Sequence, residues 1–107
     1  MSALVFTLKN EAKFTLNVAS LTPENLEGKT LAKIKKIKII YGNETVNLDT
    51  LFTVKGSNSS DIVIENSTDK LINVGQGMNK GSITIKGDVG DFLGQGMKNG
   101  TLTVVGN

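Results

Sequence analysis

The stretch VGQGMNKGSITIKGD (residues 74–88) is followed by LGQGMKNGTLTVVGN (residues 93–107), and the two align without a gap at a shift of 19 residues. The apolar residues that coincide are Val74 with Leu93, Met78 with Met97, Ile83 with Leu102, and Ile85 with Val104. An earlier stretch, DIVIEN (residues 61–66), matches SITIKG (residues 82–87) at a shift of 21 residues. A fixed period near 20 residues with matched apolar positions is the signature of a solenoid. The sequence therefore predicts a mostly β fold in which residues 53–107 form a parallel β-helix with coils of about 19 residues.

The glycines of these stretches are expected to turn corners. In a solenoid the chain reverses within a few residues, often at positive φ, which glycine adopts without steric cost. The chain has 12 glycines and one proline, a composition that fits tight turns inside a regular array. The glycines assigned this structural role are Gly75, Gly77, Gly81, Gly87, Gly94, Gly96, Gly100 and Gly106.

A phosphate-binding loop is the alternative interpretation of the same motif. A dinucleotide fingerprint needs its third glycine three residues after Gly77, but that position is Lys80 and the glycine follows it. The β-prone SITIKG comes next, whereas phosphate sites use the N-terminus of a helix. The sequence therefore favours a structural motif, and no cofactor is expected on this chain.

Residues 1–52 are predicted to form a small α+β leader that makes one compact unit with the β-helix. Alternating apolar residues indicate strands at 4–10, 14–20, 37–41 and 44–48, and a further short strand at 52–56. Helical turns are expected after Thr22-Pro23, at 31–35 and at 48–52.

The composition excludes several kinds of chemistry. The chain has no Cys and no His, which removes disulfides, thiolate nucleophiles, the Ser-His-Asp triad and the usual zinc sites. All 12 basic residues are lysines, and without Arg a nucleic-acid partner is not expected. Because no stretch approaches the roughly 18 apolar residues that cross a bilayer, no membrane partner and a cytoplasmic location are expected.

Three other polar patterns are interpreted as surface features. Asp88 and Asp91 are expected to be solvated turn residues, not a catalytic pair. A lysine run is expected to form a solvated face or a charged strand edge, at Lys33, Lys35, Lys36 and Lys38. Asn-x-Ser/Thr sequences are attributed to chance at Asn43, Asn58, Asn66 and Asn99.

The predicted last coil ends in an apolar strand without a cap. Solenoids normally cap their terminal coil, because an open one exposes backbone groups and an apolar cross-section. We expect either a partner over this end or a truncated or short member of a longer repeat protein. The candidate interface residues are Leu102, Val104 and Asn107.

The two glycine-rich stretches resemble the repeat in the C subunit of formylmethanofuran dehydrogenase, which is also found at the C-terminus of glutamate synthase large subunits. The segment LTPENLEGKTLAKIKKIKIIYGNETVNLDTLFTVKG (residues 21–56) is similar to the leader of that C subunit, with its Thr-Pro turn, GK, GNE and LF. The resemblance covers essentially the whole chain and implies a right-handed β-helix.

This resemblance implies a non-catalytic assembly subunit of an oxidoreductase complex. That complex reductively fixes carbon dioxide onto methanofuran in methanogenic archaea. Its molybdenum- or tungsten-pterin, its iron–sulfur groups and its amidohydrolase site are expected on partner subunits. A related formyltransferase/hydrolase complex of methylotrophs uses a similar C subunit and is one alternative.

Two further alternatives remain. A glutamate synthase β-helix domain is disfavoured by GKTLAKIKKIKII (residues 28–40) ahead of the coils. An independent hydrolase needs a nucleophile with an activating base, and the sequence offers no such constellation.

Overall fold

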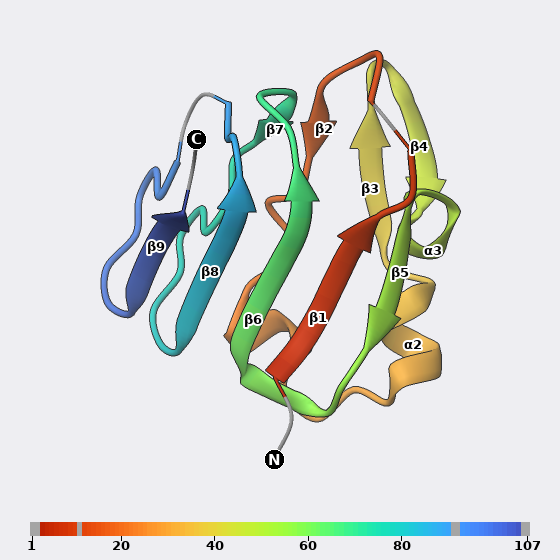
Figure 1. Cartoon of the computed structure of the whole chain (residues 1–107). Helices are drawn as coiled ribbons and strands as arrows, with labels where there is room; N and C mark the ends of the chain where they lie inside the picture. The colour runs from red at the N-terminus through yellow and green to blue at the C-terminus, as the bar shows by residue number, and fades with distance from the viewer. Residues whose placement is uncertain (1–2, 11, 91–92, 106–107) are drawn as a thin grey trace.

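The computed structural model describes residues 3–10, 12–90 and 93–105 and contains two mixed β-sheets (Figure 1). The five-stranded sheet has the order β5-β1-β6-β8-β9. Its strands are β1 (Ala3–Leu8), β5 (Phe52–Lys55), β6 (Asn58–Ser67), β8 (Ser82–Gly87) and β9 (Thr101–Val105). The four-stranded sheet has the order β4-β3-β2-β7. Its strands are β2 (Leu16–Asn17), β3 (Lys38–Tyr41), β4 (Glu44–Asn47) and β7 (Leu71–Ile72).

The predicted right-handed β-helix is wrong, and so is the interpretation of the glycine pattern as a β-helical repeat. A β-helix stacks parallel strands coil upon coil, whereas antiparallel strands complete both sheets here. β5 pairs antiparallel with β1, and β3 pairs antiparallel with both β2 and β4. The fold is a small α/β domain, because strands that follow no repeat supply much of each sheet.

The residue matches between the similar stretches are nevertheless correct. β6, β8 and β9 are parallel, and Ile62 pairs with Ile83, which pairs with Leu102. The second series runs through Ile64, Ile85 and Val104. The sequence period thus identified three neighbouring strands, but it did not identify the strand that lies beside β6 on the side away from β8.

The second neighbour of β6 is β1. Leu4 and Phe6 of this strand pair in parallel with Ile62 and Ile64 of β6. The predicted leader therefore contributes a central strand to the same sheet as residues 53–105. The division at residue 52 stays a prediction, while the shared sheet joins both parts.

The three short helices are α1 (Pro23–Leu26), α2 (Leu31–Lys35) and α3 (Leu48–Leu51). Pro23 opens α1 as expected, although the Thr22 side chain makes no capping hydrogen bond. Thr30 caps α2, with its hydroxyl oxygen accepting from the Lys33 amide at 3.3 Å. The strand expected at 14–20 shortens to β2.

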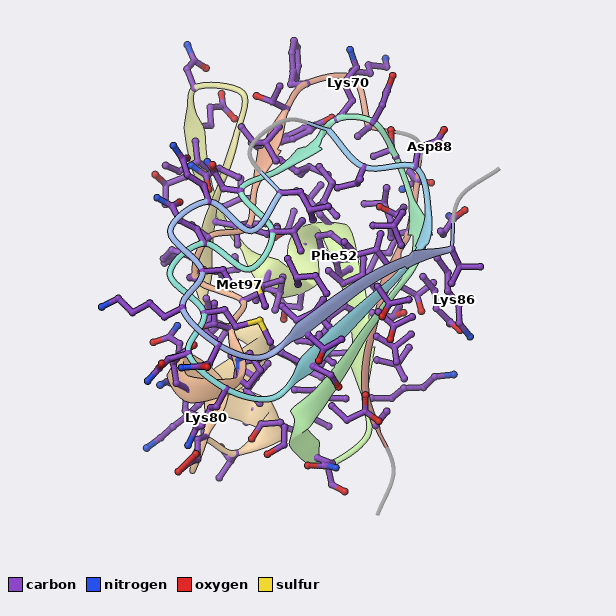
Figure 2. All side chains as sticks on the ribbon, turned by 90° about the vertical axis from the view of Figure 1, so that its left-hand side faces the viewer. Phe52, Lys70, Lys80, Lys86, Asp88 and Met97 are labelled. Carbon is purple, nitrogen blue, oxygen red and sulfur yellow. The ribbon has the colours of Figure 1, made fainter. Side chains whose placement is uncertain are left out.

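The apolar core draws on both sheets. Phe6, Ile64 and Ile85 come from the five-stranded sheet, while Leu16 and Ile39 come from the four-stranded one, and all are buried. Phe52 points into this interior in Figure 2. In the part of the chain that the structure describes, no helix is long and apolar enough to cross a membrane.

Candidate functional site

Two glycine turns precede the last two strands, and they define an inner segment (residues 74–87, ending in β8) and an outer segment (residues 93–105, ending in β9). Glycines with positive φ in these segments are Gly75, Gly77, Gly81, Gly87, Gly94, Gly96 and Gly100. Gly106 lies outside the described residues. Glycine adopts this backbone conformation without steric cost. Gly87 lies at the end of β8 and not in a turn, and the turn-forming role of these glycines stays a prediction.

The two turns hydrogen-bond to each other. The Gly94 amide donates to the Val74 carbonyl at 2.8 Å, and the Lys98 amide donates to the Met78 carbonyl at 2.8 Å. In the opposite direction, the Gly77 amide donates to the Gln95 carbonyl at 3.0 Å. A strand, not a helix, follows each turn. This geometry supports packing of one turn on the next and does not resemble a phosphate-binding loop.

The inner turn also contacts the region of helix α1. Both carboxylate oxygens of Glu24 accept from the Asn79 amide, at 2.9 and 3.1 Å. Lys80 forms an ion pair with Glu27. Sequence reasoning missed this contact, since the acidic residues of the α1 region lie more than 50 positions from the turn.

The other polar candidates do not converge on a catalytic site. Asp88 is exposed, and Asp91 lies outside the described residues. Within the described ranges, no group of three Asp or Glu side chains could hold a metal ion. In the lysine run, Lys36 pairs with Asp49 at 3.4 Å, and Lys38 donates to the Asn47 side chain. Lys33 is exposed and Lys35 partly so, as a solvated face requires.

Two of the three predicted interface residues, Leu102 and Val104, lie on β9, at one edge of the five-stranded sheet among the described strands. The Val104 side chain is 40% exposed, and Leu102 is partly buried. Leu93 and Val105 expose further apolar surface close to them in sequence. Asn107 lies outside the described residues. The structure thus brings Leu102 and Val104 together at an apolar sheet edge.

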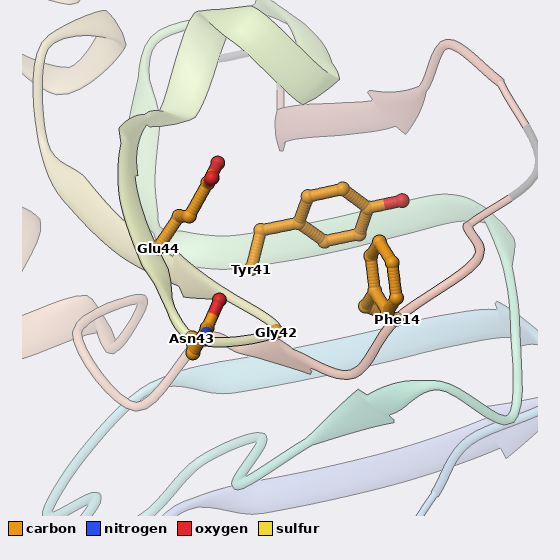
Figure 3. Close-up of a pocket in the computed structure, with 5 residues that line it drawn as sticks. All are labelled: Phe14, Tyr41, Gly42, Asn43 and Glu44. Atoms are coloured by element: carbon orange, nitrogen blue, oxygen red, sulfur yellow. The ribbon is translucent and has the colours of Figure 1, made fainter.

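A hollow of about 400 Å³ lies at the opposite side of the molecule, beside the β3–β4 hairpin (Figure 3). Its lining residues are Phe14, Tyr41, Gly42, Asn43 and Glu44. The Phe14 and Tyr41 rings meet edge to face at 5.5 Å, a favourable aromatic geometry. The Tyr41 hydroxyl accepts from the Lys13 amide at 3.0 Å, which fixes the ring. No sequence pattern indicates this hollow, because its residues come from two distant turns.

The fold is a small α/β domain with the apolar strand β9 at one edge of its five-stranded sheet among the described strands, and the known proteins that it resembles are C subunits of enzyme complexes. No protein-family model matches the sequence. The chain is 36% identical over 98 residues to the C subunit of the tungsten-containing formylmethanofuran dehydrogenase 2 of Methanothermobacter marburgensis, covering 87% of this chain and 36% of that protein. The resemblance inferred from the sequence is therefore confirmed.

Two further comparisons concern a related complex. The C subunit of the formyltransferase/hydrolase complex of Methylorubrum extorquens is 33% identical over 86 residues, covering 80% of this chain and 32% of that protein. A chain in the crystal structure of that complex with methylofuran superposes with a TM-score of 0.86 and 32% identity. This match covers 94% of the present chain and 38% of the other. The chain therefore spans about a third of the length of these relatives.

Proposed function

We propose that this chain is a non-catalytic, structural part of the C subunit in a formylmethanofuran dehydrogenase complex. The observation that carries the proposal is its 36% identity to such a subunit over 98 residues. The structural agreement with a chain of the formyltransferase/hydrolase complex supports the same class. In this role the domain binds other subunits and performs no step of the reaction itself.

The chemistry of the chain supports a structural role. Without His or Cys, it lacks the side chains that most often act as general base or soft metal ligand. Relatives are named as subunits of tungsten- or molybdenum-containing enzymes. We therefore place the metal-pterin, the iron–sulfur groups and the amidohydrolase-type site on partner subunits, in a cytoplasmic complex that attaches carbon dioxide reductively to methanofuran.

Membership of a formyltransferase/hydrolase complex is a second candidate. The TM-score of 0.86 to a chain of that complex is the observation that favours it. The two candidates share the structural role and differ in the partners. The first predicts a molybdopterin-type partner, and the second predicts partners that carry out formyl transfer and hydrolysis.

Co-purification from the native host tests the proposal. A tagged chain is expected to recover an amidohydrolase-like subunit together with a molybdopterin-type subunit, identified by mass spectrometry. Recovery with flavin and iron–sulfur subunits of an ammonia-transfer enzyme would instead favour the glutamate synthase alternative. Recovery of the chain without any of these subunits would contradict the proposal.

Leu102 and Val104 are proposed to take part in an interface with another polypeptide. Both lie on β9, an edge strand among the strands that the structure describes, and the 40% exposure of Val104 supports this assignment. A matched pair of tagged variants tests it, with Val104→Lys at this edge and Thr53→Lys at the β5 edge. Loss of binding partners is expected for the first variant and retention for the second.

A further inference from the structure

The hollow beside the β3–β4 hairpin combines two aromatic rings with a carboxylate. Tyr41 and Glu44 are direct partners in the antiparallel ladder of this hairpin, so their side chains stand on the same face with Cβ atoms about 5 Å apart. Figure 3 shows the Tyr41 ring and the Glu44 side chain rising together from the hairpin. Phe14, from the segment before β2, adds the second ring. The rings and the carboxylate therefore line one space of about 400 Å³, a size typical of small-ligand sites.

Contacts between the hairpin and the segment before β2 hold the two rings in place. The Lys13 amide donates to the Tyr41 hydroxyl at 3.0 Å, and the Gly42 amide donates to the Thr15 carbonyl at 2.8 Å. Gly42 has a φ of +64°, and a Cβ at this position would lie 3.2 Å from the Phe14 Cβ, so glycine allows the ring to pack closely. A site that is held in this way needs little rearrangement to bind a ligand.

The Glu44 carboxylate is exposed and has no cation paired with it among the described residues. The ion pairs in that part of the chain involve Asp49, Glu27 and Glu65, and none of them includes Glu44. The faces of aromatic rings are also negative, so the rings and the carboxylate attract the same kind of charge. The hollow thus favours a cation, and its apolar walls favour one that carries apolar substituents.

We propose that this hollow binds an organic ammonium group, an alkylated nitrogen cation that belongs to a small molecule or to a methylated lysine side chain. Alkyl groups on the nitrogen contact the ring faces while the positive charge lies close to the carboxylate. The site goes beyond the proposed function and is independent of it. Its five lining residues lie between residues 14 and 44, whereas the proposed subunit interface lies on β9.

Titration with choline tests the proposal, and the control ligand is the neutral analogue in which a carbon atom replaces the choline nitrogen. The chain has one Tyr and no Trp, so the tyrosine ring signals in proton NMR and the tyrosine fluorescence both come from Tyr41. Choline is expected to shift these signals saturably, with a dissociation constant of roughly 1–10 mM. The neutral analogue is expected to bind at least about fivefold more weakly. Sodium chloride at the same ionic strength should give no saturable shift.

Two variants and a matched control separate the contributions of the charge and the ring. Glu44→Gln removes the charge and keeps the shape, and Phe14→Leu replaces the ring with an aliphatic group at an exposed position. Each variant is expected to weaken choline binding at least about threefold, with Tyr41 kept as the reporter. Asp88→Asn removes the same charge from an exposed residue after β8 and should bind choline like the unmodified chain. Circular dichroism confirms that each variant is folded.

A second titration distinguishes the two sources of the ammonium group. A short peptide with one trimethylated lysine is compared with the same peptide carrying an unmodified lysine, and both are compared with choline. Binding of the methylated peptide at least about tenfold tighter than choline would support a protein side chain as the ligand. Equal affinities of the methylated peptide and choline would support a small molecule.

Four results would overturn the inference. These are the absence of a saturable shift with choline, equal binding of the neutral analogue, unchanged binding in the Glu44 or the Phe14 variant, and an equal loss in the Asp88 control. None of these measurements involves a partner subunit, so each of them leaves the proposed function intact. Failure to recover the expected subunits by co-purification would contradict the proposed function alone.

Discussion

Gly77 and Gly81 have similar backbone conformations but different surroundings. Their φ angles are +69° and +79°, a region that strains any residue with a Cβ atom. A Cβ on Gly77 would meet nothing within 4 Å, whereas one on Gly81 would lie 2.7 Å from Pro23 Cγ and 2.8 Å from the Ser60 carbonyl oxygen. An alanine at position 77 would therefore introduce backbone strain alone, whereas an alanine at position 81 would introduce both backbone strain and steric overlap.

We predict that Gly81→Ala destabilises the protein more than Gly77→Ala. The Gly77 variant is expected to lower the free energy of unfolding by about 1 kcal/mol through its positive φ. The Gly81 variant adds contact with backbone and with a proline ring, so a total loss of about 2–4 kcal/mol is expected. Urea unfolding followed by circular dichroism measures both, and equal losses would contradict the steric argument.

Two acidic residues of the α1 region contact the same turn with different strengths. Glu24 accepts a backbone amide with both oxygens, while Glu27 pairs with Lys80 across exposed surface. We predict that Glu24→Ala lowers the free energy of unfolding by about 1 kcal/mol, because a hydrogen bond to a charged acceptor is lost. Glu27→Ala should change it by less than about 0.5 kcal/mol, since exposed ion pairs contribute little. Thermal unfolding at low and high salt compares them, and a larger loss for the Glu27 variant would refute the assignment.

At the scale of elements, the position of a strand within the sheet decides how much its side chains contribute to the stability of the fold. Ile85 in β8 and Val104 in β9 are direct neighbours in the parallel ladder. Ile85 is fully buried, whereas Val104 lies on the last strand of that sheet among the described residues and is 40% exposed.

We therefore predict that Ile85→Ala lowers the free energy of unfolding by about 2–5 kcal/mol, the range for buried aliphatic truncation. Val104→Ala should cost less than about 1 kcal/mol, because its side chain is only partly buried. Denaturant unfolding is the measurement. A loss for the Val104 variant as large as the loss for the Ile85 variant would contradict the argument from burial.

The sequence predicted these neighbours correctly and their architecture wrongly, for a physical reason. Matched apolar residues at a fixed period report which side chains stack, and Ile62, Ile83 and Leu102 do stack. The period carries no information on strands outside it, so the antiparallel β5 and the β3–β4 hairpin were not assigned to the sheets that contain them. The contact of Glu24 with Asn79 was also not predicted, since no local sequence pattern links two residues 55 positions apart.

At the scale of the whole molecule, β1 joins strands from the two halves of the chain in one sheet. It lies between β5 and β6, and its Leu4 and Phe6 are almost fully buried. The placement of Leu102 and Val104 on one strand was predictable, since both belong to the last matched stretch, while their part in an interface stays a prediction. The aromatic hollow at Phe14 and Tyr41 was not predictable from the sequence, because its walls meet through tertiary packing alone.

We predict that residues 53–107 do not fold when produced alone. Without β1, one face of the β6 ladder and the pockets for Leu4 and Phe6 stay open, and so small a fragment has little core left to bury. The expected result is a disordered circular dichroism spectrum with no cooperative thermal transition, compared with the full chain under the same conditions. A cooperative transition in the fragment would show that residues 53–107 form a domain of their own.

The position of β1 also bears on biosynthesis. This strand leaves the ribosome well before its two neighbours, since β5 and β6 both begin about 50 residues later in the chain. Non-local pairing of this kind closes a long loop and slows folding. During translation β1 therefore remains unpaired with β6, and its apolar side chains remain exposed, until β6 emerges. In that interval the nascent chain is most exposed to aggregation and most dependent on chaperones.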